Sequence, residues 1–243
     1  AAEAEGAIAA AARAGVFLME GFAFRVHPLT QRLIELLRAR TIGDVRMLQA
    51  TFGYVKPYDP ASRYFAGPLG GGAILDVGGY CMAMARLIAG IARSEAFSEP
   101  IQVRGSASLA RTGVDQWAVA ELVFPGEIFA QLCTANTAVL DNRVRIFGSR
   151  GAIELPSPWF CSGKRGGLTE IIVRDADRQA VVHPVATEGW LFGIEADAVA
   201  AALPAQEAEW PGMRWADTLG NMRALDAWRA AVGVRYAADA ASQ

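Results

Sequence analysis

The sequence predicts an α+β fold: an open, mostly antiparallel or mixed sheet with helices on one face. Three observations lead to this class. Helical patterns stand near both ends of the 243-residue chain, a series of short segments with strand character fills residues 101–185, and an apolar helical segment directly precedes that series. Strands that follow one another, flanked by helices, are typical of α+β domains, whereas regular strand–helix alternation predicts a parallel sheet.

The composition indicates a globular protein with a sizeable core. Hydrophobic residues make up 53% and charged residues 20% of the chain, and the net charge is −2, which argues against disorder and against a nucleic-acid or membrane-surface binder. No apolar run is expected to reach the roughly 18 residues of a membrane span, since Arg86 interrupts the best candidate. The widely spaced Cys81, Cys133 and Cys161 fit neither a disulfide framework nor a zinc site and predict a reducing, cytoplasmic setting.

The first residues read as one helix and one strand. Residues 3–14 are alanine-rich and predict a helix that ends near Gly15. Val16-Phe17-Leu18-Met19 reads as a short buried strand of the kind found in parallel sheets. A single αβ unit cannot cover both faces of such a strand, so either further residues or another sheet must do so.

The next segment carries two candidate polar residues. Residues 21–27 are expected to be extended, which would place Arg25 and His27 on the same side just before a helix. Pro28 suits the first turn of that helix, and Gly43 is expected to end it. For His27 a structural role and an acid–base role are equally compatible with the pattern.

From Asp44 onward the pattern changes to strands. A long strand is expected at residues 45–55, followed by a loop at 56–68, and Pro125-Gly126 marks a hairpin turn between two later strands. Helical patterns return at 194–203 and 216–232. The further expected strands are 101–109, 116–124, 127–135, 143–148, 152–155, 169–174 and 180–185.

A glycine-rich stretch holds the most suggestive pair of side chains. It runs Gly70-Gly71-Gly72-Ala73-Ile74-Leu75-Asp76-Val77-Gly78-Gly79-Tyr80 and leads into the apolar helix expected at 81–89. A four-residue offset would bring Asp76 and Tyr80 to one face, as a carboxylate beside a phenol for proton transfer. The alternative is an aspartate cap on a buried helix with the tyrosine in packing, and spacing alone favours this alternative.

Other motifs of chemistry are missing from the sequence. It contains no G-x-G-x-x-G, no phosphate-binding G-x-x-x-x-G-K-[ST], no G-x-S-x-G and no zinc-type spacing, so no metal is expected. The loop Asp59-Pro60-Ala61-Ser62-Arg63-Tyr64 offers an arginine that could hold a polar ligand or simply face solvent.

Several motifs together resemble a known family. They are Met19-Glu20-Gly21-Phe22 with Arg25 and His27-Pro28, Ile42-Gly43-Asp44-Val45, the glycine-rich stretch, Ile146-Phe147-Gly148-Ser149-Arg150-Gly151-Ala152-Ile153, and Leu219-Gly220-Asn221-Met222-Arg223. In this order and spacing the chain resembles the glucose–fructose oxidoreductase / inositol dehydrogenase / rhizopine catabolism (Gfo/Idh/MocA) family, and within it the dihydrodiol and xylose dehydrogenase-like branch. The resemblance covers essentially the whole chain.

The resemblance implies a two-domain, NAD- or NADP-dependent oxidoreductase of sugars, polyols or related alcohols. In such a protein a Rossmann domain binds the cofactor, and an α+β domain supplies an open sheet for homo-oligomer assembly. By this resemblance Asp76 and Tyr80 are active-site residues, and Tyr80 is the proton donor or acceptor where many relatives carry histidine. The residues implied to lie near substrate or cofactor are Arg25, His27, Tyr54 and Arg63.

The chain departs from the family at its start. The dinucleotide glycine fingerprint and the Glu-Lys-Pro motif would precede Ala1, so the main cofactor site is expected upstream of Ala1. Lys56-Pro57 does not correspond to this motif, because it follows a different strand. The resemblance therefore implies that residues 1–41 are a remnant αβ unit of the Rossmann domain with a linking helix, and that 42–243 are the substrate and oligomerisation domain. Alone, the chain is expected to be inactive and to bind NAD or NADP weakly. The alternative is a non-catalytic binding or assembly module of the same fold.

Overall fold

The computed structural model describes residues 1–163 and 165–240, and its central feature is one eight-stranded sheet. The strand order is β2-β3-β4-β1-β5-β6-β7-β8. Strands β1 and β4 run parallel, and all other neighbours run antiparallel. The strands are β1 (Val45–Gly53), β2 (Gln102–Leu109), β3 (Asp115–Phe124), β4 (Ile128–Ala135), β5 (Val144–Gly148), β6 (Gly151–Leu155), β7 (Gly167–Asp175) and β8 (Ala180–Thr187). The predicted open, mixed sheet is confirmed.

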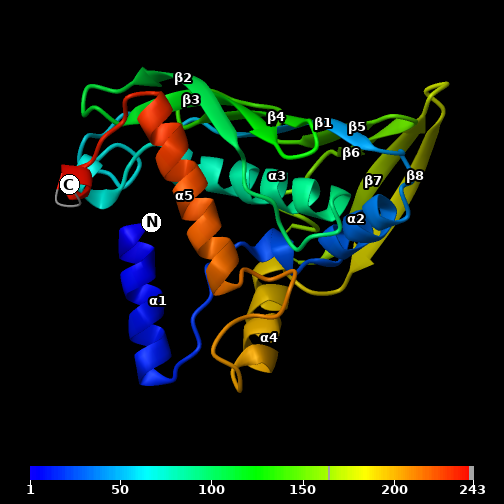
Figure 1. Ribbon diagram of the computed structural model, residues 1–243, viewed down its shortest axis with the longest axis horizontal. Coiled ribbons are helices and arrows are strands. Elements are labelled where there is room, and N and C mark those ends of the chain that lie inside the picture. Colours follow the sequence, from blue (N-terminus) through cyan, green and yellow to red (C-terminus); the bar gives the residue numbers. More distant parts are fainter. Residues whose placement is uncertain (164, 241–243) are drawn as a thin grey trace.

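The helices lie on one face of this sheet, as Figure 1 shows. Helix α3 runs directly beneath the strands, α2 and α5 flank it, and α1 packs against α5 farther from the sheet. The opposite face carries no helix in the described chain. The helices are α1 (Ala2–Ala14), α2 (Pro28–Arg38), α3 (Gly79–Ala92), α4 (Leu191–Ala202), α5 (Trp215–Ala231) and α6 (Ala237–Ala240).

Side-chain alternation explains why the sheet has one buried face. In β3, Ala118 and Leu122 point into the core, whereas Trp117 and Val119 point outward. The turn between β3 and β4 contains Gly126 with a φ of 83°, as the Pro-Gly signal predicted. The period of two therefore fixes which residues the helices cover.

Helix α3 is the centre of the core. Every residue from Cys81 to Ile91 is buried, including Arg86. By length and composition alone the stretch Gly67–Ala92 could span a membrane, and 83% of its most apolar window is buried inside the fold. The expectation that no apolar run reaches such a length is wrong, because the turns before α3 are also apolar and extend the run.

The buried Arg86 is neutralised by a network of ion pairs. Its guanidinium contacts Asp217 of α5 and Glu99, each at 2.6 Å. The other oxygen of Asp217 accepts a hydrogen bond from Arg25 at 2.6 Å. Removing one member would leave an uncompensated buried charge, which is strongly destabilising. The network therefore joins α3, α5 and the segment before α2.

The predicted strand at Val16-Phe17-Leu18-Met19 is wrong. Helix α1 forms and ends at Gly15 in the left-handed region, as expected, but the following residues pair with no strand of the described chain. Instead, Leu18 N–H donates to the Gln206 carbonyl, and its own carbonyl accepts from Trp215. A buried strand requires neighbouring strands, and loops of the α4–α5 region take their place here.

The predicted extended segment 21–27 is also wrong. Residues Ala23–Arg25 form a single 3₁₀ turn, and Ala23, Phe24 and Arg25 are all buried. Arg25 is held inside the fold by its ion pair with Asp217, a tertiary contact that a period of two cannot reveal. Helix α2 begins at Pro28 as predicted and ends at Arg38, before Gly43. The division of the chain into a Rossmann remnant at 1–41 and a second domain at 42–243 stays a prediction. In the structure, α2 and the sheet contribute to one hydrophobic core.

Candidate functional site

The glycine-rich stretch forms an irregular entry into α3. A 3₁₀ turn at Gly67–Leu69 precedes a π-helical turn at Ile74–Gly78, which continues into α3. At Gly71 a Cβ atom would lie only 2.9 Å from the backbone nitrogen of Ala66, so a side chain has no room there. Single π turns within helices are rare and frequently occur at functional sites.

Asp76 lies within the π turn, and two side chains from other elements hold its carboxylate. The hydroxyl of Tyr54, just after β1, donates to Oδ2, and Arg63 Nη1 donates to Oδ1 at 2.9 Å. The Asp76 side chain is 11% exposed, and burial raises its pKa to about 6. Asp76 is therefore a fixed, largely buried acceptor within the helical segment rather than the helix cap.

Tyr80 begins α3 inside a group of aromatic rings. Its ring centroid lies 4.8 Å from that of Phe22, 5.4 Å from that of Phe52 and 6.2 Å from that of Trp159. Burial raises the pKa of Tyr80 above its ordinary value, and the charges of nearby carboxylates, Glu195 first, add to this. No hydrogen bond joins its hydroxyl to another described residue. Tyr80 therefore carries its proton at neutral pH and is free to donate it.

Sequence reasoning missed two carboxyl groups near Tyr80. Burial is the main cause that raises the pKa of Glu20 to about 7, and burial also raises the pKa of Glu195. Oε2 of Glu20 and Oε1 of Glu195 are buried without a hydrogen-bond partner in the described chain. Glu20 stands in one of the family motifs, but the motif assigned it no role. Glu195 of α4 lies far away in sequence and gave no signal.

Cationic side chains lie next to this site. The Lys56 ammonium is 5.4 Å from the Tyr54 ring centroid and 5.0 Å from that of Tyr64. The Arg63 guanidinium lies 4.1 Å from the Tyr64 ring centroid. The loop after β1 thus brings Arg63 into contact with Asp76 and Lys56 beside the rings of Tyr54 and Tyr64.

The other two predicted residues, His27 and Arg25, make contacts with other parts of the fold. Nδ1 of His27 accepts from Leu29 N–H at 3.0 Å and so caps α2, while Nε2 lies 3.1 Å from Ser162 Oγ. Burial lowers the pKa of His27 to about 4, so the ring is neutral at pH 7 and these contacts support a structural role. Arg25 donates to Asp217 and to the Pro211 carbonyl. The two side chains do not share a face as predicted, and their contact with substrate stays a prediction.

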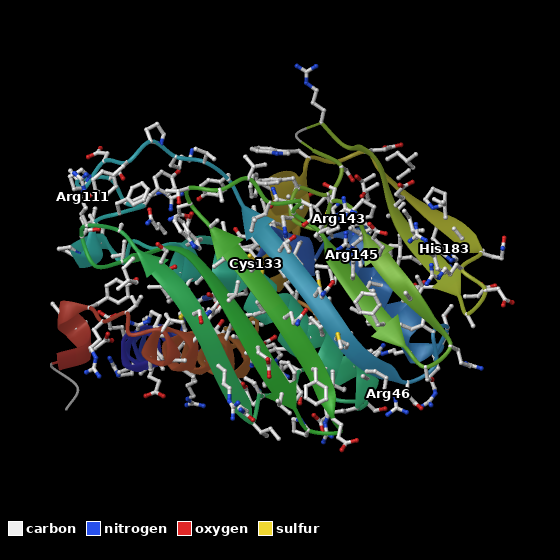
Figure 2. The ribbon with its side chains drawn as sticks, turned by 90° about the horizontal axis from the view of Figure 1, so that it is seen from above. Arg46, Arg111, Cys133, Arg143, Arg145 and His183 are labelled. Atoms are coloured by element: carbon white, nitrogen blue, oxygen red, sulfur yellow. The ribbon has the colours of Figure 1, made fainter. Side chains whose placement is uncertain are left out.

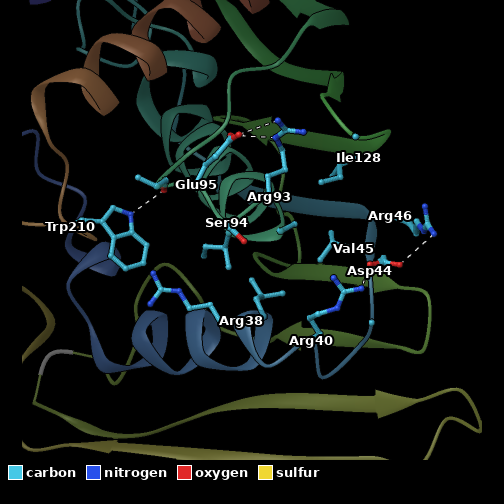
Figure 3. Close-up of a pocket in the computed structure, with 16 residues that line it drawn as sticks. Arg38, Arg40, Asp44, Val45, Arg46, Arg93, Ser94, Glu95, Ile128 and Trp210 are labelled. Carbon is cyan, nitrogen blue, oxygen red and sulfur yellow. Dashed lines mark hydrogen bonds and ion pairs between the residues drawn. The ribbon is translucent and has the colours of Figure 1, made fainter.

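A hollow lies near the opposite end of α3 from this site (Figure 3). Its volume is about 580 Å³, and arginines are prominent in its lining. Most of these are already paired, Arg40 with Asp44 and Arg93 with Glu95, while Arg38 lies against the Trp210 ring. Its lining contains no tyrosine, lysine or histidine, so the candidate site for proton transfer is the one at Asp76 and Tyr80.

The described residues supply groups for proton transfer, while weak dinucleotide binding by this chain stays a prediction. No glycine-rich turn leads from a strand into a helix N-terminus, which is where a pyrophosphate is bound in Rossmann domains. In residues 1–163 and 165–240, no group of three or more His, Cys, Asp or Glu side chains is arranged to hold a metal ion.

The first residues of the chain are held against α5. The N-terminal ammonium of Ala1 pairs with Asp226 of α5 at 2.6 Å, and Arg223 of the same helix pairs with Glu5 of α1 at 3.0 Å. These contacts attach α1 to α5. The expectation of a main cofactor site upstream of Ala1 concerns residues beyond this chain, so it stays a prediction.

Comparison with known proteins identifies similar sequences. Residues 30–154 match the model of the GFO/IDH/MocA C-terminal domain. The chain is 30% identical to trans-1,2-dihydrobenzene-1,2-diol dehydrogenase of Danio rerio over 240 residues, which cover 96% of this chain and 67% of that protein. It is 31% identical to the Macaca fascicularis enzyme of the same name over 171 residues, covering 70% and 47% of the two chains. The chain thus spans about half the length of most relatives it matches.

Solved structures share the fold. An aldose-aldose oxidoreductase from Caulobacter crescentus, complexed with glycerol, superposes with a TM-score of 0.79 at 24% identity, covering 96% of this chain and 66% of that one. The 3-ketoreductase KijD10 from Actinomadura kijaniata, in complex with TDP-benzene and NADP, gives a TM-score of 0.76 at 23% identity, with 94% and 66% covered.

The buried carboxyl of Glu20 makes stability depend on pH. Because folding raises its pKa from 4.5 to about 7, its contribution is fully present below pH 4.5 and is lost as the pH rises to about 7. We expect Glu20→Gln to remove this loss, so that the variant gains up to roughly 3 kcal/mol relative to wild type between pH 4.5 and 8. Urea unfolding across this range measures the effect, with the exposed Glu209→Gln as control. Parallel pH profiles for Glu20→Gln and wild type would contradict it.

Proposed function

Because this chain belongs to the GFO/IDH/MocA family of oxidoreductases, we propose that it forms the substrate side of an NAD(P)-dependent enzyme. The enzyme would act on CH–OH groups of sugars, polyols or related alcohols. The observation that carries this proposal is the Tyr80 hydroxyl, which no described residue holds by a hydrogen bond. It lies among aromatic side chains and close to the fixed carboxylate of Asp76. The names of similar proteins support oxidation or reduction at such groups. These proteins are a diol dehydrogenase, an aldose oxidoreductase and a ketoreductase.

Tyr80 is the residue that exchanges the proton of the reacting hydroxyl. In reduction, its protonated phenol donates to the oxygen of the substrate carbonyl as that oxygen gains negative charge. In oxidation it must accept a proton, and for this a cation near the phenol has to lower its pKa. The carboxylates around Tyr80 act in the opposite direction, so the chain alone favours the acid form.

Asp76 positions the substrate. Above a pH of about 6 its carboxylate is ionised, and Tyr54 and Arg63 fix both of its oxygens. A hydroxyl group of the substrate can donate to this acceptor while a neighbouring oxygen faces Tyr80. A polyol or sugar, which carries adjacent hydroxyls, suits this arrangement.

We propose that the main dinucleotide site lies outside the described residues. NAD or NADP would supply or take up the hydride in a protein that joins this chain to a dinucleotide-binding part, which we place upstream of Ala1. We propose that residues 1–243 alone bind neither dinucleotide tightly and have no activity. KijD10, which was solved with NADP, supports a nicotinamide cofactor for the complete protein.

The proposal is tested by Tyr80→Phe in the protein that includes its dinucleotide-binding part. We expect turnover of sugars or polyols with NAD or NADP to fall roughly a hundredfold or more, because general acid–base catalysis by one side chain contributes this much. The control is Tyr58→Phe, at an exposed tyrosine of the neighbouring loop.

Near-normal turnover of Tyr80→Phe would remove Tyr80 from the mechanism. A wild-type protein that turns over no sugar, polyol or related alcohol with either cofactor would contradict the proposed function and favour the alternative of a non-catalytic binding or assembly module.

We also propose that the open face of the sheet pairs with a second copy of the chain. Figure 2 looks onto this face, where Cys133, Arg143 and Arg145 lie over the strands. Val119 of β3 is 46% exposed and Phe129 of β4 is 42% exposed. Large apolar side chains exposed on neighbouring strands are typical of a surface that another protein covers.

Assembly through this face predicts that Phe129→Glu produces monomers. Wild type is expected to be a dimer or larger, because the apolar side chains of two sheets would cover one another. Sedimentation velocity at micromolar concentrations measures the state, with Leu203→Glu, an exposed leucine just after α4, as control. A monomeric wild type, or an unchanged Phe129→Glu oligomer, would contradict the proposal.

The cysteines support a reducing location. Cys81, Cys133 and Cys161 are all free thiols, and only Cys133 is partly accessible. Burial raises the pKa of all three thiols, which keeps them unreactive at neutral pH. We propose that the protein works in the cytoplasm, where free thiols persist.

A further inference from the structure

A carboxylate from the sheet reaches the start of the helical segment that carries the candidate site. Asp115, the first residue of β3, has no exposed surface, and its Oδ2 accepts the backbone N–H of Ile74 at 2.7 Å. We propose that Asp115 is a positioning residue, which fixes the first turn of this segment and thereby holds Asp76 and Tyr80 in place. This role in catalysis rests on the proposed function.

The segment lacks a cap of its own. The first N–H groups of a helix have no partner within it, and Ala73 precedes the π turn without a side chain that can accept a hydrogen bond. The polar residues that commonly cap helices are Ser, Thr, Asp and Asn, and none stands at residues 70–75. Asp115 supplies the acceptor from a position 41 residues later in the chain. Without it, a buried N–H group would be left unpaired, which is costly.

The glycine at residue 72 makes room for this carboxylate. Gly72 has a φ of 117°, a conformation that other residues rarely adopt. A Cβ atom there would overlap Oδ1 of Asp115 and would lie 3.2 Å from the hydroxyl oxygen of Tyr236. Part of the glycine-rich stretch is therefore explained by the approach of Asp115 rather than by contact with a ligand.

Two further side chains hold the same turn. The hydroxyl of Thr134 in β4 donates to the Ala73 carbonyl at 3.0 Å, and the hydroxyl of Tyr236 donates to the Gly71 carbonyl. Together with Asp115 they form what we call the entry clamp. The sheet thus determines where the helical segment begins.

The charge of Asp115 suits this position. The N-terminus of a helix carries a partial positive charge that favours a carboxylate. Burial raises the pKa of Asp115 to about 6, and the N–H of Ile74 opposes this rise. At pH 7 the group is therefore ionised and accepts a stronger hydrogen bond than a neutral side chain would.

The clamp acts on the site through one continuous element. Asp76 follows Ile74 by two residues within the π turn, and Tyr80 lies in the first turn of α3. A π turn is an uncommon backbone state. If the clamp no longer holds the first residues of the segment, the π turn can convert to an ordinary helical turn. This conversion would move Asp76 away from Tyr54 and would turn the Tyr80 ring within its aromatic surroundings.

Hydrogen exchange measured by NMR on the 243-residue chain tests the clamp directly. We expect Asp115→Ala to speed the exchange of the Ile74 amide at least about tenfold more than any loss of global stability explains, because its buried acceptor is gone. Asp115→Asn keeps an acceptor oxygen and should restore most of the protection. Leu155→Ala, at a buried residue of β6, is the control that lowers global stability alone.

Exchange of Ile74 that follows global stability equally in Asp115→Ala and Leu155→Ala would overturn the proposal. If Asp115→Ala does not fold, Asp115→Leu, which preserves volume without an acceptor, is measured in its place.

A kinetic experiment on the complete protein tests the link to catalysis. Asp115→Ala should lower kcat at least about tenfold and also raise KM, because both Tyr80 and the substrate-positioning Asp76 shift, and Asp115→Asn should recover most of both. Unchanged kcat alongside faster Ile74 exchange would overturn the role in catalysis. A wild-type protein without turnover would instead contradict the proposed function, while the exchange experiment would still decide whether Asp115 holds the helix.

Discussion

Burial of α3 beneath the sheet is the constraint on which the rest of the structure depends. This helix places a guanidinium, that of Arg86, in the centre of the core, and a buried charge is tolerated only when it is paired. Asp217 and Glu99 provide the pairing, and Asp217 also binds Arg25. The same contacts therefore fix α5 and the turn before α2, and so bring Glu20 and Phe22 toward Tyr80.

The electrostatics of the site follow from this arrangement. Asp76, Glu20 and Glu195 surround a phenol that no described residue holds by a hydrogen bond, and their charges add to the effect of burial in raising its pKa. Arg63 and Lys56 lie on the outer side, where Arg63 pairs with Asp76. The chain thus presents a proton donor, since Arg63 lowers the pKa of Tyr80 less than burial and the carboxylates raise it. We propose that a second domain with its cofactor completes this site.

Local patterns in the sequence predicted most of the fold. Alternation and the Pro125-Gly126 turn located the strands of the sheet, because a half-buried strand has a period of two wherever it lies. The segments 16–19 and 21–27 were misjudged because their structure depends on tertiary partners, the loops of the α4–α5 region and Asp217. For the site, the order of family motifs directed attention to Asp76 and Tyr80. Asp115 and Glu195 approach the site from distant parts of the chain, and no local sequence pattern predicts their position there.

We propose that this chain supplies the protonated half of a redox site. The pKa of the Tyr80 phenol measures this most directly, followed by the ¹³C chemical shift of Cζ in tyrosine-labelled chain and assigned with Tyr80→Phe. The pKa of Tyr80 is expected to lie above its ordinary value of about 10, since burial and three carboxylates oppose ionisation. A midpoint well below 10 would contradict it, because the chain alone would then activate Tyr80 as a base.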